Sequence, residues 1–415
     1  MTTSVASTSE TDQQGSPFWQ RNLAVAIFGS FTTIIGMTLL LPFLPLYIQE
    51  LGVSDPAAIV QWSGIAFGAT FLSAALVAPL WGQLADRYGR KLMLIRASLG
   101  MTLAISLLGM AQNVTQFVLL RLLVGLLGGY ASGSFVLVAT QTPKARSAWA
   151  LGMLSSGIMA GNLAGPLVGG YLPSIIGIRS TFLAAGAVIF VAFLATALLI
   201  REEKRPPSQT KAKQKAGFSA VVDRRPLYAM LFTGMLLMLA NMSIEPIITV
   251  YVGQLVSNPA QVTLVSGFVM SGAALGSILS APRLGKLADR VGHWRVIIGC
   301  LAVSALLLVP QAFVTAGWQL VALRFLMGAS LGGLLPCVAS VIRHNVPDHV
   351  AGTMLGYSTS SQYVGQVVGP VLGGFVGGHF GMRAVFFGTA VLMALGACFN
   401  VWARTRTARP GGPRP

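Results

Sequence analysis

Residues 82–91 read GQLADRYGRK and lie between two long apolar runs. A closely related stretch, GKLADRVG, occupies residues 285–292, which begin 203 positions further along the chain. The glycines allow a tight turn, and the charged side chains can stay in water at the face of a membrane. A repeat at so long an interval predicts that a whole bundle of helices is duplicated, with one copy in each half of the chain.

The composition indicates a membrane protein. Of the 415 residues, 54% are hydrophobic and 9% are charged, whereas soluble domains carry roughly 25% charged residues. Apolar runs of about 20 residues recur, each long enough to cross the hydrocarbon layer as a helix, and the strand-type alternation of a membrane barrel is not the pattern. We therefore expect an all-α integral membrane protein with twelve transmembrane helices, which begin near residues 23, 58, 92, 116, 148, 181, 227, 261, 295, 318, 351 and 383.

The spans group into two halves with polar segments around them. The segment 201–226 is basic and contains prolines, so it is expected to be a cytoplasmic linker. The first residues are rich in Ser and Thr and lack the basic start and apolar core of a cleavable signal. The expected organisation is a disordered cytoplasmic N-terminus (1–20), a six-helix bundle (21–200), the linker (201–226), a second six-helix bundle (227–403) and a cytoplasmic tail (404–415).

The positive charge predicts the orientation in the membrane. The net charge is +17, and in membrane proteins Lys and Arg concentrate in cytoplasmic loops. With the N-terminus inside, the inner segments hold 24 of the 28 basic residues, the outer loops hold Arg179 and Arg383, and Arg121 and Arg324 fall within spans. We expect a multi-pass protein of the cell (inner) membrane with both termini in the cytoplasm, and no nucleic-acid partner.

The two halves match well beyond the charged loop. With offsets of 203 or 204, the residues that recur are Pro42, Tyr47, Arg121, Gly125, Pro143, Gly152, Gly165, Pro166, Gly169, Gly170, Gly177 and Arg179, which correspond to Pro246, Tyr251, Arg324, Gly328, Pro347, Gly356, Gly369, Pro370, Gly373, Gly374, Gly381 and Arg383. Because each half has six spans, both halves enter the membrane from the same side. They are therefore parallel repeats related by an axis along the membrane normal.

These motifs resemble the major facilitator superfamily over residues 20–403. The loop signature of that superfamily is filled by Gly82, Leu84, Asp86, Arg87, Gly89, Arg90 and Lys91. Arg121 with Gly125 resembles its fourth-helix signature, and GNLAGPLVGG at 161–170 resembles the fifth-helix signature of proton-coupled exporters. Within the superfamily the chain is most similar to the twelve-helix drug/proton antiporters, around LPFLPLY, WSGI, KLMLIRASLGM and WALG.

The resemblance implies roles for two of these motifs. It makes the 82–91 loop, with Asp86 and the arginines beside it, a cytoplasmic gate. In agreement with this role, we expect Asp86 to hold a helix N-terminus of the other half near Ala351 and to pair with Arg87 or Arg90; a solvated loop that only sets topology is the alternative. It makes the small-residue face of the fifth helix a seal of the central cavity, whereas close helix packing alone is the alternative. The residues of that face are Gly161, Gly165, Pro166, Gly169 and Gly170.

Glu245 is the one acidic residue inside an apolar run. A charge in the bilayer costs about 2.5–3.5 kcal/mol even on insertion scales, so such a residue is a functional candidate. In one hypothesis it carries the coupled proton and attracts cationic substrates; in the other it is a permanent ion-pair partner of Arg324 or Arg121. Pro246 removes a backbone donor and predicts a broken, cavity-lining helix. Leu41 occupies the matching position of the first half, where related proteins carry an acid, so a simple transfer of their proton site fails.

A drug cavity needs aromatic and apolar surface with a few polar groups. Candidates within the spans, each of which could equally pack against helices or lipid, are Trp62, Tyr130, Phe135, Asn162, Asn241, Tyr357 and Gln366. Cys300, Cys337 and Cys398 have neither paired spacing nor a nearby histidine, so no metal or other cofactor is expected. The absence of an HExxH motif or of paired carboxylates argues against an enzyme, and the absence of a Walker motif argues against ATP-driven pumping.

The sequence therefore predicts a proton-coupled secondary exporter of amphipathic or cationic drugs, monomeric, that works by alternating access. A transporter of the same fold for one metabolite, such as a sugar, an amino acid or a siderophore, is the first alternative. A membrane sensor that binds a ligand without transporting it is the second.

Overall fold

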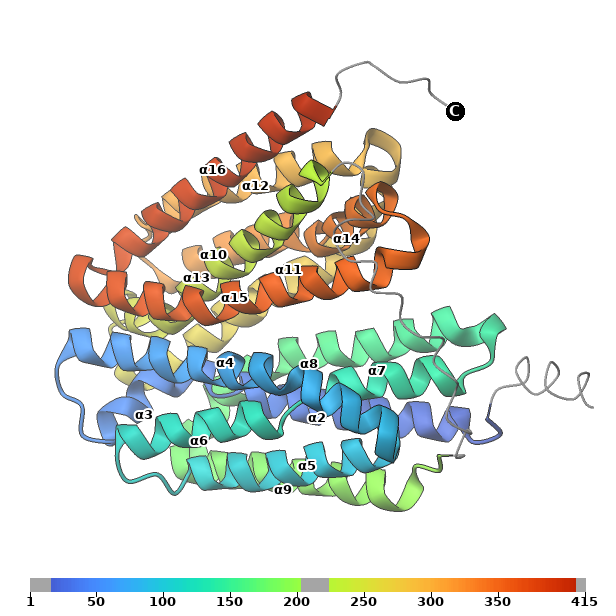
Figure 1. The fold of residues 1–415 in the computed structure, drawn as a ribbon. Coiled ribbons are helices and arrows are strands. Elements are labelled where there is room, and N and C mark those ends of the chain that lie inside the picture. The colour runs from blue at the N-terminus through green and yellow to red at the C-terminus, as the bar shows by residue number, and fades with distance from the viewer. Residues whose placement is uncertain (1–15, 203–223, 408–415) are drawn as a thin grey trace, which may run out of the picture. The chain divides into compact units, whose positions relative to one another are not determined.

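The structure is a computed structural model that describes residues 16–202 and 224–407; within them the side chains of Asp86, Asp348, His349, Arg406 and Thr407 are not described. Over these ranges the chain is helical (Figure 1). The helices of the first half are α2 (Trp19–Thr38), η1 (Leu41–Phe43), α3 (Leu44–Glu50), α4 (Pro56–Tyr88), α5 (Arg90–Leu108), α6 (Val114–Leu127), α7 (Tyr130–Gln141), η2 (Lys144–Arg146), α8 (Ser147–Ile176) and α9 (Ile178–Leu199). Those of the second half are α10 (Arg225–Leu255), η4 (Pro259–Gln261), α11 (Val262–Val291), α12 (His293–Gln311), α13 (Gly317–Leu331), α14 (Leu334–Asn345), α15 (Asp348–Phe380) and α16 (Met382–Thr407).

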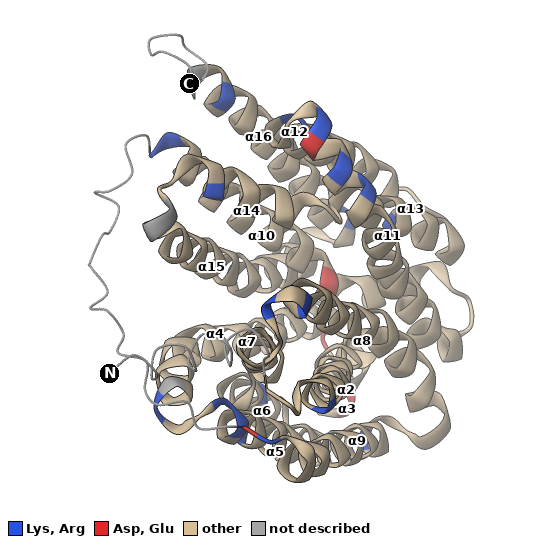
Figure 2. Cartoon of the chain, turned by 90° about the vertical axis from the view of Figure 1, so that its right-hand side faces the viewer, with Lys and Arg blue, Asp and Glu red and all other residues tan. Residues whose placement is uncertain are grey.

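The twelve expected spans are all found as helices. Each helix begins within four residues of its expected start. Among the described residues, 11 segments are long and apolar enough to cross a membrane. The twelfth, α15, has 33 residues but lower hydropathy, because glycine, serine and glutamine interrupt its apolar positions. In Figure 2 the helices are tan along most of their length, and the blue segments lie mainly at helix ends and connections.

By their contacts the helices form two compact units. The first comprises residues 1–52 and 69–208, and the second comprises residues 53–68 and 209–415. Residues 53–68, which include the N-terminal part of α4, thus group with the second unit although their sequence position places them in the first bundle. Glycines explain this grouping, since a Cβ at Gly374 or Gly378 would meet the backbone of Val60 or Ala57 at 2.8–2.9 Å.

In the first unit, small residues of α8 face α2. A Cβ on Gly161 would lie 2.9 Å from the carbonyl oxygen of Phe31, and Cβ atoms on Gly165 and Gly169 would overlap Thr38 and Leu39. Pro166 and Gly170 of the same motif are also buried. The glycines therefore bring two helix backbones into direct contact, as small residues do where lipid supplies no hydrophobic drive.

The second unit repeats this packing between α15 and α10. A Cβ on Gly369 would lie 2.6 Å from the carbonyl oxygen of Leu239, and one on Gly373 would overlap that of Ser243. The close packing expected from the duplicated motif is thus present in both units. It fixes α10, which carries Glu245, against α15.

A tyrosine pair confirms the internal repeat at atomic detail. Tyr47 donates its hydroxyl proton to the carbonyl oxygen of Leu108 at 2.6 Å, and Tyr251 donates to that of Gln311 at 2.9 Å. Both tyrosines are buried against a phenylalanine of the sixth helix of their half, Phe182 or Phe386. Each bond ties the end of the first span to the end of the third.

The expectation of a broken helix at Pro246 is wrong. α10 continues from Arg225 through Pro246 to Leu255, whereas the first span of the other half is divided into α2, η1 and α3. The first half has two prolines three residues apart, Pro42 and Pro45, but Thr249 stands at the second position in α10. One proline removes a single helical hydrogen bond, which a helix can tolerate, while two in succession interrupt it.

Candidate functional site

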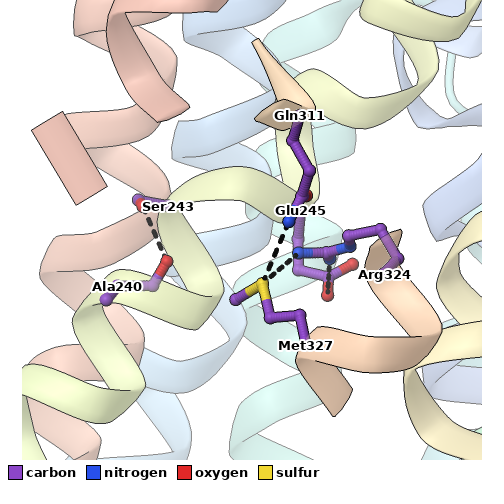
Figure 3. A network of polar contacts seen from close by, with 6 residues as sticks. All are labelled: Ala240, Ser243, Glu245, Gln311, Arg324 and Met327. Carbon is purple, nitrogen blue, oxygen red and sulfur yellow. Dashed lines mark hydrogen bonds and ion pairs between the residues drawn. The ribbon is translucent and has the colours of Figure 1, made fainter. Parts of the chain in front are cut away.

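The candidate site lies within the second unit, where α10, α12 and α13 meet around Glu245. α10 and α13 run in opposite directions through the bilayer, so the late residue Glu245 of one meets the early residue Arg324 of the other. Arg324 Nη2 lies 3.4 Å from Glu245 Oε1 (Figure 3). Arg324 and Arg121 were the two candidates for the ion-pair partner of Glu245. Arg324, which lies in the same unit as Glu245, is the one that pairs with it.

Two further side chains complete the cluster. The sulfur of Met327, one turn after Arg324, lies 3.7 Å from Arg324 Nη1 and 3.6 Å from Gln311 Nε2. Gln311 Nε2 also donates to the carbonyl oxygen of Leu307 at 3.0 Å. In Figure 3 dashed lines join the sulfur of Met327 to the amide of Gln311 and to the guanidinium of Arg324, and another joins the guanidinium to the carboxyl group of Glu245.

The cluster is buried and incompletely hydrogen-bonded. The side chain of Arg324 is 1% exposed and that of Glu245 is 13% exposed. Among the described residues, Glu245 Oε2, Gln311 Oε1 and Arg324 Nε have no hydrogen-bond partner. An unpaired buried polar atom costs about 1–3 kcal/mol. The two oxygens are therefore suited to accept a hydrogen bond from a water molecule or a polar group of a substrate, and the N–H group of Arg324 Nε is suited to donate one.

The internal repeat shows where this cluster is specific to the second half. Arg324 has the counterpart Arg121, which is likewise buried, at 2% exposure. Leu41, Leu108 and Val124 occupy the positions that match Glu245, Gln311 and Met327, and they too are buried. The first half therefore has apolar residues at these three positions, and the second half has an acid, an amide and a thioether there.

Arg121 itself lies in α6 of the first unit. Thr70 Oγ1 donates to its backbone carbonyl oxygen at 3.0 Å, and a Cβ at Gly125, one turn later, would overlap the carbonyl oxygen of Thr70. The fourth-helix signature thus positions α6 tightly against α4 within that unit. Its role in coupling remains a prediction.

Gln311 and Met327 were not predicted from the sequence. Gln311 lies at the end of α12 and looks like an ordinary helix-terminal residue, and Met327 looks like a core residue. The signal that could have identified both was the comparison of the halves, since polar or polarizable residues replace Leu108 and Val124 of the first half.

The residues expected to line a drug cavity divide between the units. In the first unit Tyr130 is 1% exposed, and its hydroxyl is 2.7 Å from Thr196 Oγ1, so it belongs to the helix packing. Phe135 packs against the cluster around Leu23 and Val138, while Asn162 is exposed on α8. Of the three candidates in the first unit, Tyr130 is the most deeply buried.

The other four candidates are in the second unit. Asn241 is half-buried one turn before Glu245 on α10, and Trp62 and Gln366 are half-buried on α4 and α15. Tyr357 is 42% exposed. Asn241 is thus the candidate that shares a helix face with the ion pair, because residues four apart are neighbours on a helix.

The charged loop carries a helix cap that was not foreseen. Glu202, just after α9, accepts hydrogen bonds from the backbone N–H groups of Arg90 at 2.8 Å and Lys91 at 2.7 Å. A carboxylate at a helix N-terminus satisfies free donors and the helix dipole. Gly89 has φ +96°, and a Cβ there would lie 2.9 Å from Glu202 Oε2, so both the turn and the cap require glycine. The expected contacts of Asp86 lie outside the described side chains.

Arg96 makes a second set of contacts near the charged loop. It lies inside α5, with its Cζ 3.7 Å from the ring centre of Trp81, and its Nη2 donates to the carbonyl oxygen of Gly128 at 3.1 Å. Trp81 Nε1 donates to the carbonyl oxygen of Leu126 at 2.8 Å. The stacked pair thus satisfies two carbonyl groups at the joint between α6 and α7, where the helical bonding is interrupted.

Within the described residues there is no group of three or more His, Cys, Asp or Glu side chains that could hold a metal ion. Cys300, Cys337 and Cys398 are all free thiols. The chemistry of the described site is therefore that of one buried carboxyl group beside a guanidinium.

Comparisons with known proteins agree with this architecture. The sequence profile of the Major Facilitator Superfamily matches residues 26–266 and 230–415. Among curated proteins, the multidrug resistance protein MdtG of Enterobacter lignolyticus is 42% identical over 396 residues, covering 95% of each chain. That of Salmonella arizonae is 43% identical over 383 residues, covering 92% of this chain and 95% of the other.

Solved structures with a similar fold are more distant in sequence. A bacterial homologue of the human lysosomal transporter Spinster superposes with a TM-score of 0.74 at 16% identity, covering 96% of this chain and 99% of the other. The nucleoside transporter NupG gives a TM-score of 0.70 at 13% identity, covering 91% and 99%. At such identities the likeness concerns the fold alone.

Proposed function

Because the chain belongs to the Major Facilitator Superfamily, a family of membrane transporters rather than enzymes, we propose that it exports amphipathic or cationic drugs in exchange for protons. The drug class is supported by the relatives described above, which are named multidrug resistance proteins and match over nearly the whole chain. The transport step is alternating access, in which two six-helix bundles rock about a central cavity. The protein lies in the cell (inner) membrane as a monomer with both termini in the cytoplasm, in line with its basic loops.

The observation that carries proton coupling is the ion pair of Glu245 and Arg324. In a site without water, a carboxyl group next to an arginine has two stable states. It is either ionised and paired with the arginine, or protonated and no longer paired with it. Arg324 stays charged in both. Exchange between the two states is therefore a way to link a proton to the conformational cycle.

Substrate binding uses the same group. The ionised Glu245 attracts a cationic drug, and its free Oε2 atom offers the acceptor. Polar and aromatic surface for the drug is supplied in the second unit by Asn241, one turn before Glu245 on α10, and by Trp62, Tyr357 and Gln366. In the first unit it is supplied by Phe135 and Asn162. Arg121 contributes positive charge to the coupling machinery of the first unit. The gate at 82–91, which includes Asp86, and the glycine seal at 161–170 complete the cycle.

The experiment is drug-dependent proton movement in everted membrane vesicles that contain the native protein or the Glu245→Gln variant. Gln keeps the size of the side chain and removes its titration, so we expect drug-dependent proton movement to disappear. Asp289→Asn is the matched control, because Asp289 is 76% exposed at a helix end. Full proton movement in Glu245→Gln would leave the ion pair with a structural role only.

A further inference from the structure

A groove in the first unit lies outside the site described above. It holds about 300 Å³ between the N-terminal part of α2 and the start of α8. Its wall is formed mainly by Trp19, Leu23, Ile27, Arg146, Trp149 and Met153. The volume is at the lower end of the range for small-molecule sites, so the groove would hold part of an amphiphile rather than a whole drug.

The groove is apolar along its length and basic at one end. Leu23 and Ile27 follow Trp19 at intervals of four residues on α2, and Met153 follows Trp149 on α8, so the apolar wall runs along the helices, as an acyl chain does. Arg146 stands at the end where η2 leads into α8. An occupant that matches this wall has an apolar chain and an anionic head.

Two tryptophans frame the groove at the level where Arg146 lies. The rings of Trp19 and Trp149 are perpendicular, with centroids 6.4 Å apart, and Trp149 is 58% exposed. Tryptophan rings collect at the membrane–water interface because they are apolar with one polar edge. The groove therefore opens at headgroup depth.

Further positive charge surrounds this end of the unit. Arg21 and Arg201 both stack on Phe18, with Cζ 4.9 Å and 5.1 Å from the ring centre, and Lys144 begins η2. Arg21 also has two buried nitrogens, Nε and Nη2, without a hydrogen-bond partner among the described residues. Such a basic surface repels a cationic drug and attracts an anionic headgroup.

The second half of the chain lacks this pattern. Val350 and Thr353 occupy the positions that match Arg146 and Trp149 at an offset of 204. The combination of arginine and tryptophan is therefore an addition to one unit, and the duplicated fold does not require it.

We propose that this groove binds one anionic phospholipid of the cytoplasmic leaflet, with an acyl chain along Leu23, Ile27 and Met153 and the phosphate on Arg146. The leaflet follows from the orientation proposed above, whereas the binding itself requires no transport. Basic pockets between membrane helices bind anionic headgroups in this way. The lipid would hold the inner ends of α2 and α8 together.

The test uses the intact protein in phosphatidylcholine vesicles that contain phosphatidylglycerol, with bromine on the acyl chains of one lipid or the other. Bromine quenches nearby tryptophan fluorescence. In the native protein brominated phosphatidylglycerol should quench more than brominated phosphatidylcholine. Trp149→Phe should reduce this excess, and Trp19, which also lines the groove, should account for the remainder. Arg146→Gln should weaken the preference for phosphatidylglycerol about fivefold, the effect of one basic residue near a membrane surface.

Arg343→Gln is the matched control, since Arg343 is an exposed cation at the inner end of α14 and lies outside the groove. It should keep the preference. Equal quenching by both lipids, an unchanged preference in Arg146→Gln, or reversal of the quenching by inorganic phosphate would each overturn the proposal. These outcomes are independent of proton coupling, because no substrate or gradient is present.

Discussion

Arg324 and Glu245 are unequal partners: their nearest atoms are 3.4 Å apart, but the arginine side chain is 1% exposed and the carboxyl-bearing side chain is 13% exposed. The guanidinium is fixed in the interior with Met327 beside it. The carboxyl group keeps one oxygen without a hydrogen-bond partner among the described residues. In the coupling mechanism proposed above, this asymmetry favours Glu245 as the group that exchanges the proton and Arg324 as its permanent counter-charge.

Replacing Arg324 alone should destabilise the protein more than replacing both partners. Arg324→Met leaves the Glu245 carboxylate buried and unpaired, and such a break costs about 3–5 kcal/mol. The double variant Arg324→Met with Glu245→Gln removes both charges and should recover most of that loss. Thermal unfolding in detergent measures both; equal losses for the single and double variants would contradict a charge-based account.

Gly373→Ala should weaken the packing of α15 on α10. The new Cβ would overlap the backbone carbonyl of Ser243, which cannot rotate away, so we expect a loss of about 1–3 kcal/mol. Gly356→Ala on the same helix is the matched control, because nothing lies within 4 Å of a Cβ there, and its effect should stay within about 0.5 kcal/mol. Unfolding midpoints that shift equally would show that the glycine face is not closely packed.

Glu202→Ala should loosen the start of α5. The backbone N–H groups of Arg90 and Lys91 lose their acceptor, and loss of a helix cap costs about 0.5–2 kcal/mol. We expect faster hydrogen exchange in the peptide that contains these amides. Asp289→Ala, in the corresponding loop of the second half, should leave that peptide unchanged; equal protection in Glu202→Ala and the native protein would rule out the cap.

Membrane potential should affect neutral and cationic drugs differently. One proton entering at about 100 mV supplies about 2.3 kcal/mol, which supports a gradient of about fiftyfold for a neutral drug. Exchange of one proton for one monovalent cation moves no net charge, so it should respond to the pH difference alone. Uptake into everted vesicles with the potential clamped separates the two cases, and equal voltage dependence would argue against one-for-one exchange.

The number of helices and the internal repeat could be predicted because both leave long, regular signals. The expected span starts follow from apolar runs, and the correspondence of Tyr47 with Tyr251 follows from a constant offset. These signals exist because the hydrocarbon core of a membrane offers no hydrogen-bond partners, so each span forms its backbone hydrogen bonds within its own helix. They extend over 20 residues or more, so single substitutions do not hide them.

Side-chain partnerships were less predictable because they depend on neighbours far apart in sequence. Glu245 stood out as a lone acid, but Gln311 and Met327 beside it did not, and Tyr130 was expected in a cavity although it is buried against Thr196. Pro246 was expected to break its helix, which it does not, because Pro45 has no counterpart there.

The most direct test of the central claim is transport by the purified protein in sealed liposomes, with and without an imposed pH gradient. If Glu245 exchanges a proton for the drug, accumulation should rise with the gradient in the native protein and should not respond to it in Glu245→Gln. Accumulation that is the same with and without the gradient in the native protein would contradict proton coupling.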